Sequence, residues 1–499
     1  MSYMLKDMQP TILHVDTEVL RASIGVGELF VLPSTTIKAC YGIPRSEAGS
    51  TSKAASPIPG ETEDVKDRPI NGWLIGPELE AALMAGGEEK WEVRWPFRED
   101  KKVQDWEGRE FVLKHLLKLL GIEPATNTSP LILIPPPSPP CLPLDTQATY
   151  TQLAFENLNV PGLSIFPAPL LSLFALNATT GIILHIGRHS TEISIVIDSV
   201  VRWECSTTVH VGEADCEAFF ENLLMQDEGL EAELVAAKGS PLVDGEKRKL
   251  VKQVAEVVWR ECTGDDVEIP VAKSGLASVV IGATQTQEDE GTIDVAKKLA
   301  NDTMPPPTNT SHKSKKQQAA ATAAANAAAA AVLADVISIN IPSFPEKEIN
   351  LGPVRHRLAE PLLRGKTTGS ETVWEAMGRA VESPSLGLAE RMAIWEGVGI
   401  VGDLVRFKSL PRALITYLAP FLLSSTDVPS EIQPARVRLL SIPEYFTNYK
   451  GATTDLAPFL GGQMIAKVAF NDSMGKHCIT KVDYNLKGPA AIYAVNQGE

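Results

Sequence analysis

The segment 181–198, GIILHIGRHSTEISIVID, carries the side chains best placed for chemistry. Two runs of β-branched and apolar residues flank the turn 187–190, Gly-Arg-His-Ser, and His185 stands just before that turn. A guanidinium or an imidazole at a hairpin tip can bind a phosphate, because both groups can donate hydrogen bonds to its oxygens. The same pattern is typical of an ordinary strand-turn-strand element. The segment therefore leaves two interpretations open, a phosphate-handling hairpin and plain sheet.

Other chemistry-bearing patterns are weak. The six cysteines form no C-x-x-C pair and no zinc-type spacing with histidine, which indicates reduced thiols. His210 and His477 stand alone and are interpreted as ordinary imidazoles. SHKSKK at 311–316 is either a local basic patch or a solvated loop, and PPPSPP at 135–140 is either a polyproline ligand or a rigid turn. The solvated loop and the rigid turn are the favoured interpretations.

The bulk composition limits the function classes. A chain of 499 residues is too long for a single hydrophobic core, so we expect more than one lobe. The 46 Lys and Arg against 62 Asp and Glu give a net charge of −16, which opposes a continuous electropositive surface for nucleic acid. Because no apolar run reaches the length needed to span a bilayer, we expect a protein of the cytoplasm or nucleus.

The order of elements predicts an α/β protein. TILHVD (11–16) and ELFVLPS (28–34) are typical of the two arms of an opening hairpin, and the periodic segment 105–122 is typical of an amphipathic helix before a strand at 131–137. Further helices and strands are expected at 212–226, 245–262, 336–345 and 387–423. The polar, proline-rich and alanine-rich stretch 284–332 is predicted to be a disordered or low-complexity insertion.

The closing segments carry a resemblance to a known family. FLGGQMIAKVAF (459–470) followed by ITKVDYNLKGPAAI (479–492) resembles the C-terminal signature of actin, WIGGSILASL followed by ISKQEYDESGPSIV. FENLNVPGLSIFPAPLLSLFALNATTGIIL (155–184) resembles another actin segment in the right order. The chain thus resembles the actin-related protein family. With its wide insertion and the run SIPEYF at 441–446, it is most similar to the nuclear class that fungal SWI/SNF and RSC chromatin remodellers carry.

The resemblance implies an actin-like fold. In this fold two lobes are each built on a mixed five-stranded sheet with helices, as in ribonuclease H, and a small subdomain is inserted in the first lobe. The first lobe is then expected at 1–44, 69–167 and 450–499, with 45–104 including the small subdomain, and the second lobe at 168–449.

The resemblance also implies a cleft in which two hairpins clamp a nucleotide through backbone N–H groups, with carboxylates that hold Mg²⁺. Asp16 keeps the leading carboxylate of the first hairpin, but the Gly-Ser-Gly that follows in actin has no counterpart, and Glu18 stands near the tip. In the second hairpin His185 and Arg188 fall on the two aspartates of the family. Only Gly187 is retained there, so both clamps are predicted to be degenerate.

Other residues that the resemblance places in the cleft also differ from those the family uses for catalysis. Ala168 falls on the glutamine that orients the attacking water and cannot form a side-chain hydrogen bond. Gly402 is retained, whereas Asp403 replaces a second glycine and adds negative charge. We therefore predict no catalysis, no metal and no required cofactor. Two alternatives stay open: metal-free ATP binding through Arg188, and Asp16 as either a strand-end acceptor or a ligand to metal-bound water.

What remains of the family's working surfaces is a groove between the two lobes that accepts an amphipathic helix. In the remodeller class the resemblance implies that this helix is the helicase/SANT-associated helix of the motor ATPase. The residues that map to the groove are Phe174, Thr179, Val200, Ile465 and Val468.

The partners implied by the resemblance are that motor helix, a second actin-related protein and other remodeller subunits, with the nucleosome contacted only indirectly. The expected location is the nucleus. Neither membrane binding nor filament formation is expected, because 49–66 does not resemble the loop that actin uses in filaments. The competing interpretations are a nucleotide-binding or slow ATPase of the actin superfamily and a cytoskeletal actin-related protein.

Overall fold

The computed structural model describes residues 8–27, 29–45, 72–85, 89–98, 104–136, 142–269, 335–367, 369–422, 434, 436–450, 454–470 and 477–496. The chain divides into two compact units. The first unit comprises Met1–Asp215, Pro361–Arg406 and Pro420–Glu499, and the second comprises Cys216–Glu360 and Phe407–Ala419. The lobe boundaries expected at 167/168 and 449/450 stay a prediction. The insertion 284–332, its basic run 311–316 and most of PPPSPP lie outside the described residues.

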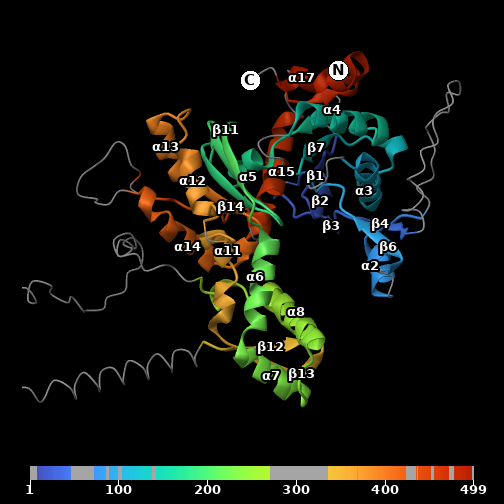
Figure 1. The fold of residues 1–499 in the computed structure, drawn as a ribbon. Helices are drawn as coiled ribbons and strands as arrows, with labels where there is room; N and C mark the ends of the chain where they lie inside the picture. The colour runs from blue at the N-terminus through green and yellow to red at the C-terminus, as the bar shows by residue number, and fades with distance from the viewer. Residues whose placement is uncertain are drawn as a thin grey trace, which may run out of the picture. The chain divides into compact units, whose positions relative to one another are not determined.

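The first sheet of the first unit has six strands (Figure 1). In spatial order they are β15 (Ile479–Thr480), β8 (Gly162–Ile165), β7 (Leu131–Ile134), β1 (Thr11–Val15), β2 (Val19–Ile24) and β3 (Thr35–Lys38). β7 runs parallel to β1 and β8, and the other neighbours are antiparallel. The sheet is therefore mixed, as expected.

Alternation along these strands sends apolar side chains to both faces. Leu13 of β1 and Leu133 of β7 join a core with α3 (Trp106–Leu119), α4 (Leu144–Gln152), α16 (Lys481–Lys487) and α17 (Ala491–Asn496). Ile12 and Ile132 point to the opposite face, where they pack against α5 (Ala168–Ala175) and α15 (Ala457–Ala469). The sheet is buried on both sides, which explains its nearly continuous apolar runs.

The second sheet of the first unit contains the hairpin 181–198. Its order is β11 (Val200–Val209), β10 (Thr191–Ile197), β9 (Gly181–Ile186) and β14 (Val398–Val401), with β14 parallel to β9. A fifth strand is reduced to one bridge between Val398 and Leu439. Within the described residues the two large sheets therefore have six and four strands, where the resemblance implied five each.

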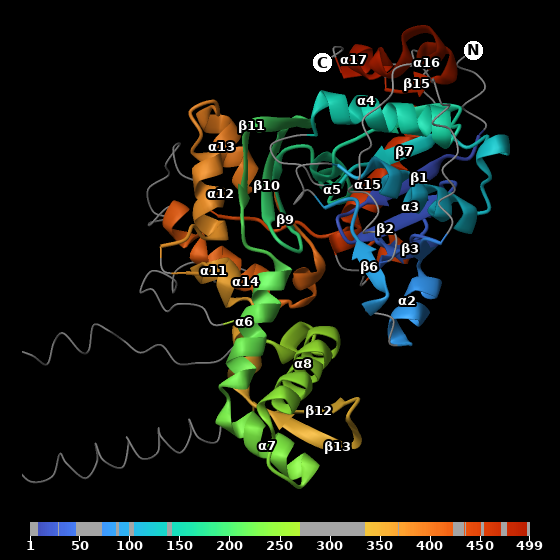
Figure 2. The same cartoon turned by 45° about the vertical axis from the view of Figure 1, so that its right-hand side comes forward.

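Helices cover both faces of this second sheet as well. α12 (Val373–Val381) and α13 (Leu388–Trp395) pack against β9, β10 and β11. On the other face, Leu173 of α5 and Leu176, which directly follows this helix, pack against Ile183 and Val196. Helices α5 and α15 thus lie between the two large sheets, as both views show (Figure 1, Figure 2).

The crossing of α5 and α15 is unusually close. A Cβ atom on Gly461 of α15 would lie 1.9 Å from the carbonyl oxygen of Leu171 in α5. A Cβ on Gly462 would lie 2.8 Å from a methyl of Ile134 in the first sheet. Any side chain at Gly461 would meet backbone that cannot rotate away. The two glycines therefore let α15 pack against α5 and the sheet at the same time.

The predicted opening hairpin is wrong in its second arm. β1 turns at Asp16 into β2, Val19–Ile24, and the amide of Asp16 donates to the carbonyl of Val19 at 3.0 Å. Residues 29–34 form no strand, because Phe30 has a positive φ of 49° and Pro33 has no N–H to donate. The other expected elements at 105–122, 131–137, 181–198, 212–226, 245–262, 336–345 and 387–423 are confirmed.

A small three-stranded sheet follows β3 in the chain. Its order is β5 (Leu74–Ile75), β4 (Tyr41–Pro44) and β6 (Trp91–Arg94), and α2 (Pro77–Met84) is connected to it. The segment after β6 is held by Arg109 of α3, whose side chain is 2% exposed and whose Nε donates to the carbonyl of Pro96 at 2.9 Å. This bond fixes the chain just before Arg98.

The second unit packs helices on a two-stranded sheet. Its elements are α6 (Glu213–Met225) from Cys216 onward, α7 (Glu228–Lys238), α8 (Asp244–Glu261), β12 (Ile337–Ile341), β13 (Phe344–Leu351), the start of α11 (Glu360–Arg364), and α14 (Ser409–Tyr417). α7 packs on β13 and α8 on β12.

Two adjacent side chains hold the chain on both sides of 270–334. Arg355, which is 4% exposed, donates to the carbonyls of Asp266 and Asp335, each at 2.8 Å. The amide of Glu268 donates to Nδ1 of His356 at 2.6 Å, so Nε2 carries the proton and donates to the Asp335 carboxylate at 2.8 Å. Asp266, Glu268 and Asp335 are therefore held beside one another in the second unit.

Candidate functional site

The predicted cleft residues come together where the turns of the two large sheets meet, inside the first unit. Asp16 directly follows β1, and its Oδ1 accepts the amide of Thr17 at 2.6 Å. His185 is near the end of β9, paired in register with Val401 of β14. Gly402 follows with φ of 133°, and a Cβ there would lie 2.5 Å from the carbonyl oxygen of Ile186. Glycine at 402 is thus required for the close approach of β14 to β9.

The amides around these turns are used within the chain. The amide of Gly187 donates to the carbonyl of Ser190 at 2.9 Å, and those of Glu213 and Ala214 donate to the carbonyls of Gly187 and Arg188 at 3.0 and 2.8 Å. Gly212 allows this contact, because a Cβ there would lie 2.5 Å from the Gly187 oxygen. The N-terminus of α6, which could otherwise attract an anion, is therefore capped by the second hairpin.

Burial keeps both histidines of the cleft neutral. Burial, aided by the charge of Arg21, lowers the pKa of His14 to about 3. Burial also lowers the pKa of His185, against the attraction of Asp16. Burial alone would raise the pKa of Asp16, but the positive charges of His185 and His14 in their protonated forms, and of Arg21, outweigh it, so the pKa of Asp16 lies below its usual value. At neutral pH Asp16 is ionised beside two uncharged imidazoles.

A partly buried glutamate lies on the other side of the cleft. Oε1 of Glu213 accepts the amide of Asp403 at 3.2 Å. Burial, followed by repulsion from Asp403 and Asp16, raises the pKa of Glu213 to about 8. The Asp403 carboxylate is paired with Arg406 at 3.1 Å. Among the described residues no group of three or more His, Cys, Asp or Glu side chains is arranged to hold a metal ion.

Glu18 projects from the first turn toward cations of the other sheets. Its Oε1 accepts a hydrogen bond from Nη2 of Arg98, and Nε of Arg188 lies 3.9 Å from the same oxygen. An anionic side chain therefore stands between the two hairpin tips. Its charge repels other anions, and it is already balanced by guanidinium groups.

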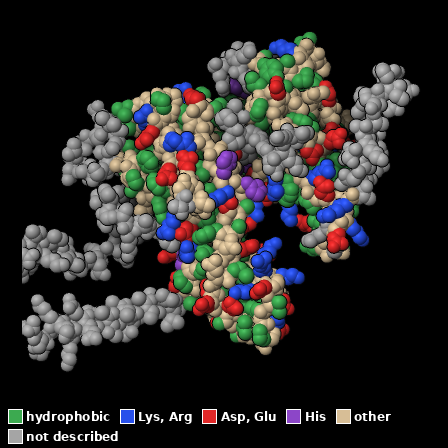
Figure 3. Space-filling model, in the orientation of Figure 1, with side chains coloured by type: hydrophobic (Ala, Val, Ile, Leu, Met, Phe, Trp, Pro, Cys, Tyr) green, Lys and Arg blue, Asp and Glu red, His purple; other side chains and the backbone are tan. Residues whose placement is uncertain are grey.

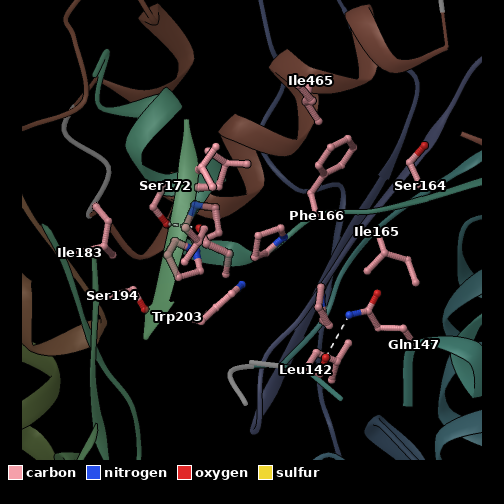
Figure 4. Close-up of a pocket in the computed structure, with 18 of the residues that line it drawn as sticks. Leu142, Gln147, Ser164, Ile165, Phe166, Ser172, Ile183, Ser194, Trp203 and Ile465 are labelled. Atoms are coloured by element: carbon pink, nitrogen blue, oxygen red, sulfur yellow. Dashed lines mark hydrogen bonds between the residues drawn. The ribbon is translucent and has the colours of Figure 1, made fainter. Parts of the chain in front are cut away.

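A separate cavity of about 870 Å³ runs beside α5 in the first unit (Figure 4). Figure 4 shows Ile465 of α15 above it, Ser172 and Trp203 on one side, and Gln147 and Leu142 on the other. Its lining includes Phe174, Val200, Ile465 and Val468, which are four of the five residues mapped to the partner groove. Thr179 is exposed outside this lining, where its carbonyl accepts the amide of Ser199 at 2.8 Å.

The lining is suited to an apolar ligand surface. It contains no Lys, Arg or Asp among the described residues, and Glu192 is its one carboxylate. Val200 and Val468 are 44% and 58% exposed. Ala168 and His185 also line it, so its inner end reaches the floor of the cleft. The volume falls in the range of about 300–1,000 Å³ that is usual for ligand pockets.

Comparison with known proteins agrees with this architecture. The family model described as Actin matches residues 13–260. The chain contains an actin domain. It is similar to a Schizosaccharomyces pombe protein named "SWI/SNF and RSC complexes subunit arp9", with 23% identity over 421 residues, 79% of this chain and 77% of that protein. It is also similar to an "Actin-like protein" of Neurospora crassa, with 34% identity over 95 residues, 19% of this chain and 24% of that protein.

The actin resemblance expected from the sequence is confirmed, together with the α/β fold class. The roles of the individual cleft and groove residues of this actin domain stay predictions. Three residues of the cleft were not anticipated: His14, Arg98 and Glu213. His14 could have been found from the strand period, because it shares the parity of Ile12 on the face toward α5 and α15.

No local pattern reveals the other two. Arg98 meets Glu18 from 80 positions away, and Glu213 meets Asp403 from 190 positions away. Arg98 and Glu213 contact the cleft only because the fold brings distant parts of the chain together. Local sequence spacing does not predict such contacts.

We expect Glu213→Gln to remove a pH dependence of stability. The pKa of Glu213 is raised from 4.5 to about 8 on folding, so the folded state binds more protons and stability falls as pH rises through this window. Gln keeps the acceptor for the Asp403 amide and carries no charge. The variant should match the wild type near pH 5 and exceed it near pH 9 by on the order of a few kcal/mol in urea unfolding. Equal stability of the two proteins at the higher pH would contradict this assignment.

Proposed function

We propose that this chain is a non-catalytic actin-related subunit of a SWI/SNF- or RSC-type nucleosome-remodelling complex in the nucleus. It binds the helicase/SANT-associated helix of the motor ATPase beside a second actin-related protein and couples that helix to motor regulation. The supporting relative is the Schizosaccharomyces pombe subunit, because the likeness extends over 79% of this chain. The closing segments and the insertion point to the same class, and within it to actin-related protein nine.

The single observation that carries the binding role is the cavity beside α5. An amphipathic helix docks through apolar anchors at i, i+3, i+4 and i+7, which need a long apolar slot. Phe174, Ile465 and Val468 supply such a surface from α5 and α15, and Val200 and Trp203 extend it along β11. The partly exposed valines have apolar area left to bury on a partner.

The charge distribution supports an indirect relation to the nucleosome. The chain carries a net charge of −16. On the face drawn in Figure 3, Lys and Arg side chains are interspersed with Asp and Glu rather than gathered into one patch. DNA binding needs several phosphate contacts from clustered cations. No helix of the described residues is long and apolar enough to cross a membrane.

We expect Val468→Asp and Val200→Asp to weaken binding of a peptide spanning the motor's helicase/SANT-associated helix. A carboxylate at either position must be desolvated against the apolar face of the helix, so the Kd should rise at least about tenfold. Both side chains are partly exposed, so the fold should be preserved. Fluorescence anisotropy with a labelled peptide measures the change.

Leu486→Asp is the matched control, because Leu486 of α16 is 78% exposed and lies outside the cavity lining. It should bind the peptide like the wild type. If both valine variants bind normally, or if Leu486→Asp alone loses the peptide, the groove assignment fails.

The second candidate function, a nucleotide-binding protein or slow ATPase, is favoured by the actin domain and the retained Asp16. Against it, the amides of Asp16, Thr17 and Gly187 already have partners within the chain, and Glu18 stands between the turns. ATP with Mg²⁺ at about 100 times a typical Kd should stabilise a true binder by about 2.7 kcal/mol. We expect no rise in Tm and no phosphate release. Turnover that disappears in Asp16→Ala would establish the enzyme instead.

A further inference from the structure

One carboxylate contacts cations that belong to two other sheets. Glu18 stands in the turn between β1 and β2 of the six-stranded sheet. Arg188 stands in the turn between β9 and β10 of the four-stranded sheet, and Arg98 follows β6 of the small sheet. Nη2 of Arg98 donates to Oε1 of Glu18, and Nε of Arg188 lies 3.9 Å from that oxygen. A single oxygen therefore joins three sheets within the first unit.

Each of the three residues is presented by constrained backbone. The turn of Glu18 is closed by the bond from the Asp16 amide to Val19, and the turn of Arg188 by the bond from the Gly187 amide to Ser190. The Arg98 guanidinium also lies over the Trp95 ring at 4.2 Å. Holding the groups in advance lowers the entropy that an ion pair otherwise costs.

The environment strengthens the contact. The side chains of Glu18, Arg98 and Arg188 are 27%, 23% and 29% exposed, so water screens them less than it screens surface pairs. Asp16 and Asp403 place further negative charge near Arg188 and the turns. They make the site unfavourable for an external anion, while the tethered Glu18 is held next to the cations by its own chain.

We propose that Glu18 is a latch, a built-in anion that holds the three sheets around the cleft in a fixed relation. In this role the Glu18 carboxylate occupies the position between Arg98 and Arg188 that a bound anion could otherwise take. The inference is independent of the helix-binding proposal, because it concerns the closure of the cleft and not the groove. With this latch, the arrangement of the three sheets around the cleft does not require a bound ligand.

The test is hydrogen exchange measured by mass spectrometry on the full chain. Glu18→Gln keeps the size of the side chain and removes its charge. Peptides that contain the turns at 16–19 and 187–190 should exchange about fivefold faster than in the wild type, the effect of losing an ion pair of about 1 kcal/mol. Raising NaCl should accelerate exchange at the same turns in the wild type and have less effect in Glu18→Gln. Peptides from α8 in the second unit should not change.

Arg188→Gln and the double variant separate a latch from two unrelated effects. If the two residues act together, the double variant should exchange no faster than Glu18→Gln. Glu80→Gln is the matched control, because it breaks an exposed pair with Lys38 at 2.8 Å and should leave both turns unchanged. Unchanged exchange in Glu18→Gln, multiplied effects in the double variant, or salt-independent exchange in the wild type would overturn the proposal.

Discussion

The packing of α15 against α5 at Gly461 is the constraint on which the first unit depends. With hydrogen as its side chain, Gly461 lets the two helices cross so closely that a methyl group would overlap the Leu171 carbonyl. One helix pair then covers the inner face of both large sheets. The chain leading into α15 adds side-chain ties to each sheet: Asp455 pairs with Arg21 of β2 at 2.9 Å, and Thr454 donates to the carbonyl of Ile400 in β14.

Both candidate surfaces follow from this shared layer. The turns of β1–β2 and β9–β10 meet because their sheets are held on the same helices, and there Glu18 and Arg188 face each other. The cavity is lined by Phe174 of α5 and Ile465 of α15. At the turns the amides of Asp16 and Gly187 and the Glu18 carboxylate have partners within the chain, while Val200 and Val468 along the cavity are exposed. The contrast between paired polar groups at the turns and exposed apolar side chains along the cavity favours partner binding over nucleotide chemistry. The fold itself does not decide between the two.

The sequence predicted the elements with strong periodicity. The helix at 245–262 follows from Leu250, Val251, Val254 and Val258, which form one apolar stripe. The strand Val19–Ile24 was missed because Arg21 interrupts its apolar pattern. Residues 28–34 were predicted to form a strand, but 29–34 form a loop. An apolar run reveals neither the positive φ of Phe30 nor the hydrogen bonds that fix this loop. The carbonyl of Val31 accepts from the Tyr449 hydroxyl at 2.9 Å, from far along the chain.

For the site, residue types could be aligned with a family, but their pairing could not be predicted. Glu18 and Arg188 were each identified as departures from a phosphate clamp, and their contact with each other and with Arg98 follows only from three-dimensional placement. The pKa of Glu213 likewise depends on burial and on Asp403, neither of which is visible at 212–215. Four of the five residues mapped to the groove line one cavity and lie on regular helices and strands, whereas Thr179 lies in a loop outside it; their binding role stays a prediction.

The groove, and not the cleft, is the surface that we propose for partner binding. The most direct measurement is photo-cross-linking in the assembled remodelling complex, with p-benzoylphenylalanine in place of Val468 and, separately, in place of Leu486. We expect a cross-link from position 468 to the helicase/SANT-associated helix of the motor ATPase and none from position 486. No cross-link to the motor from position 468, or one from position 486 alone, would contradict it.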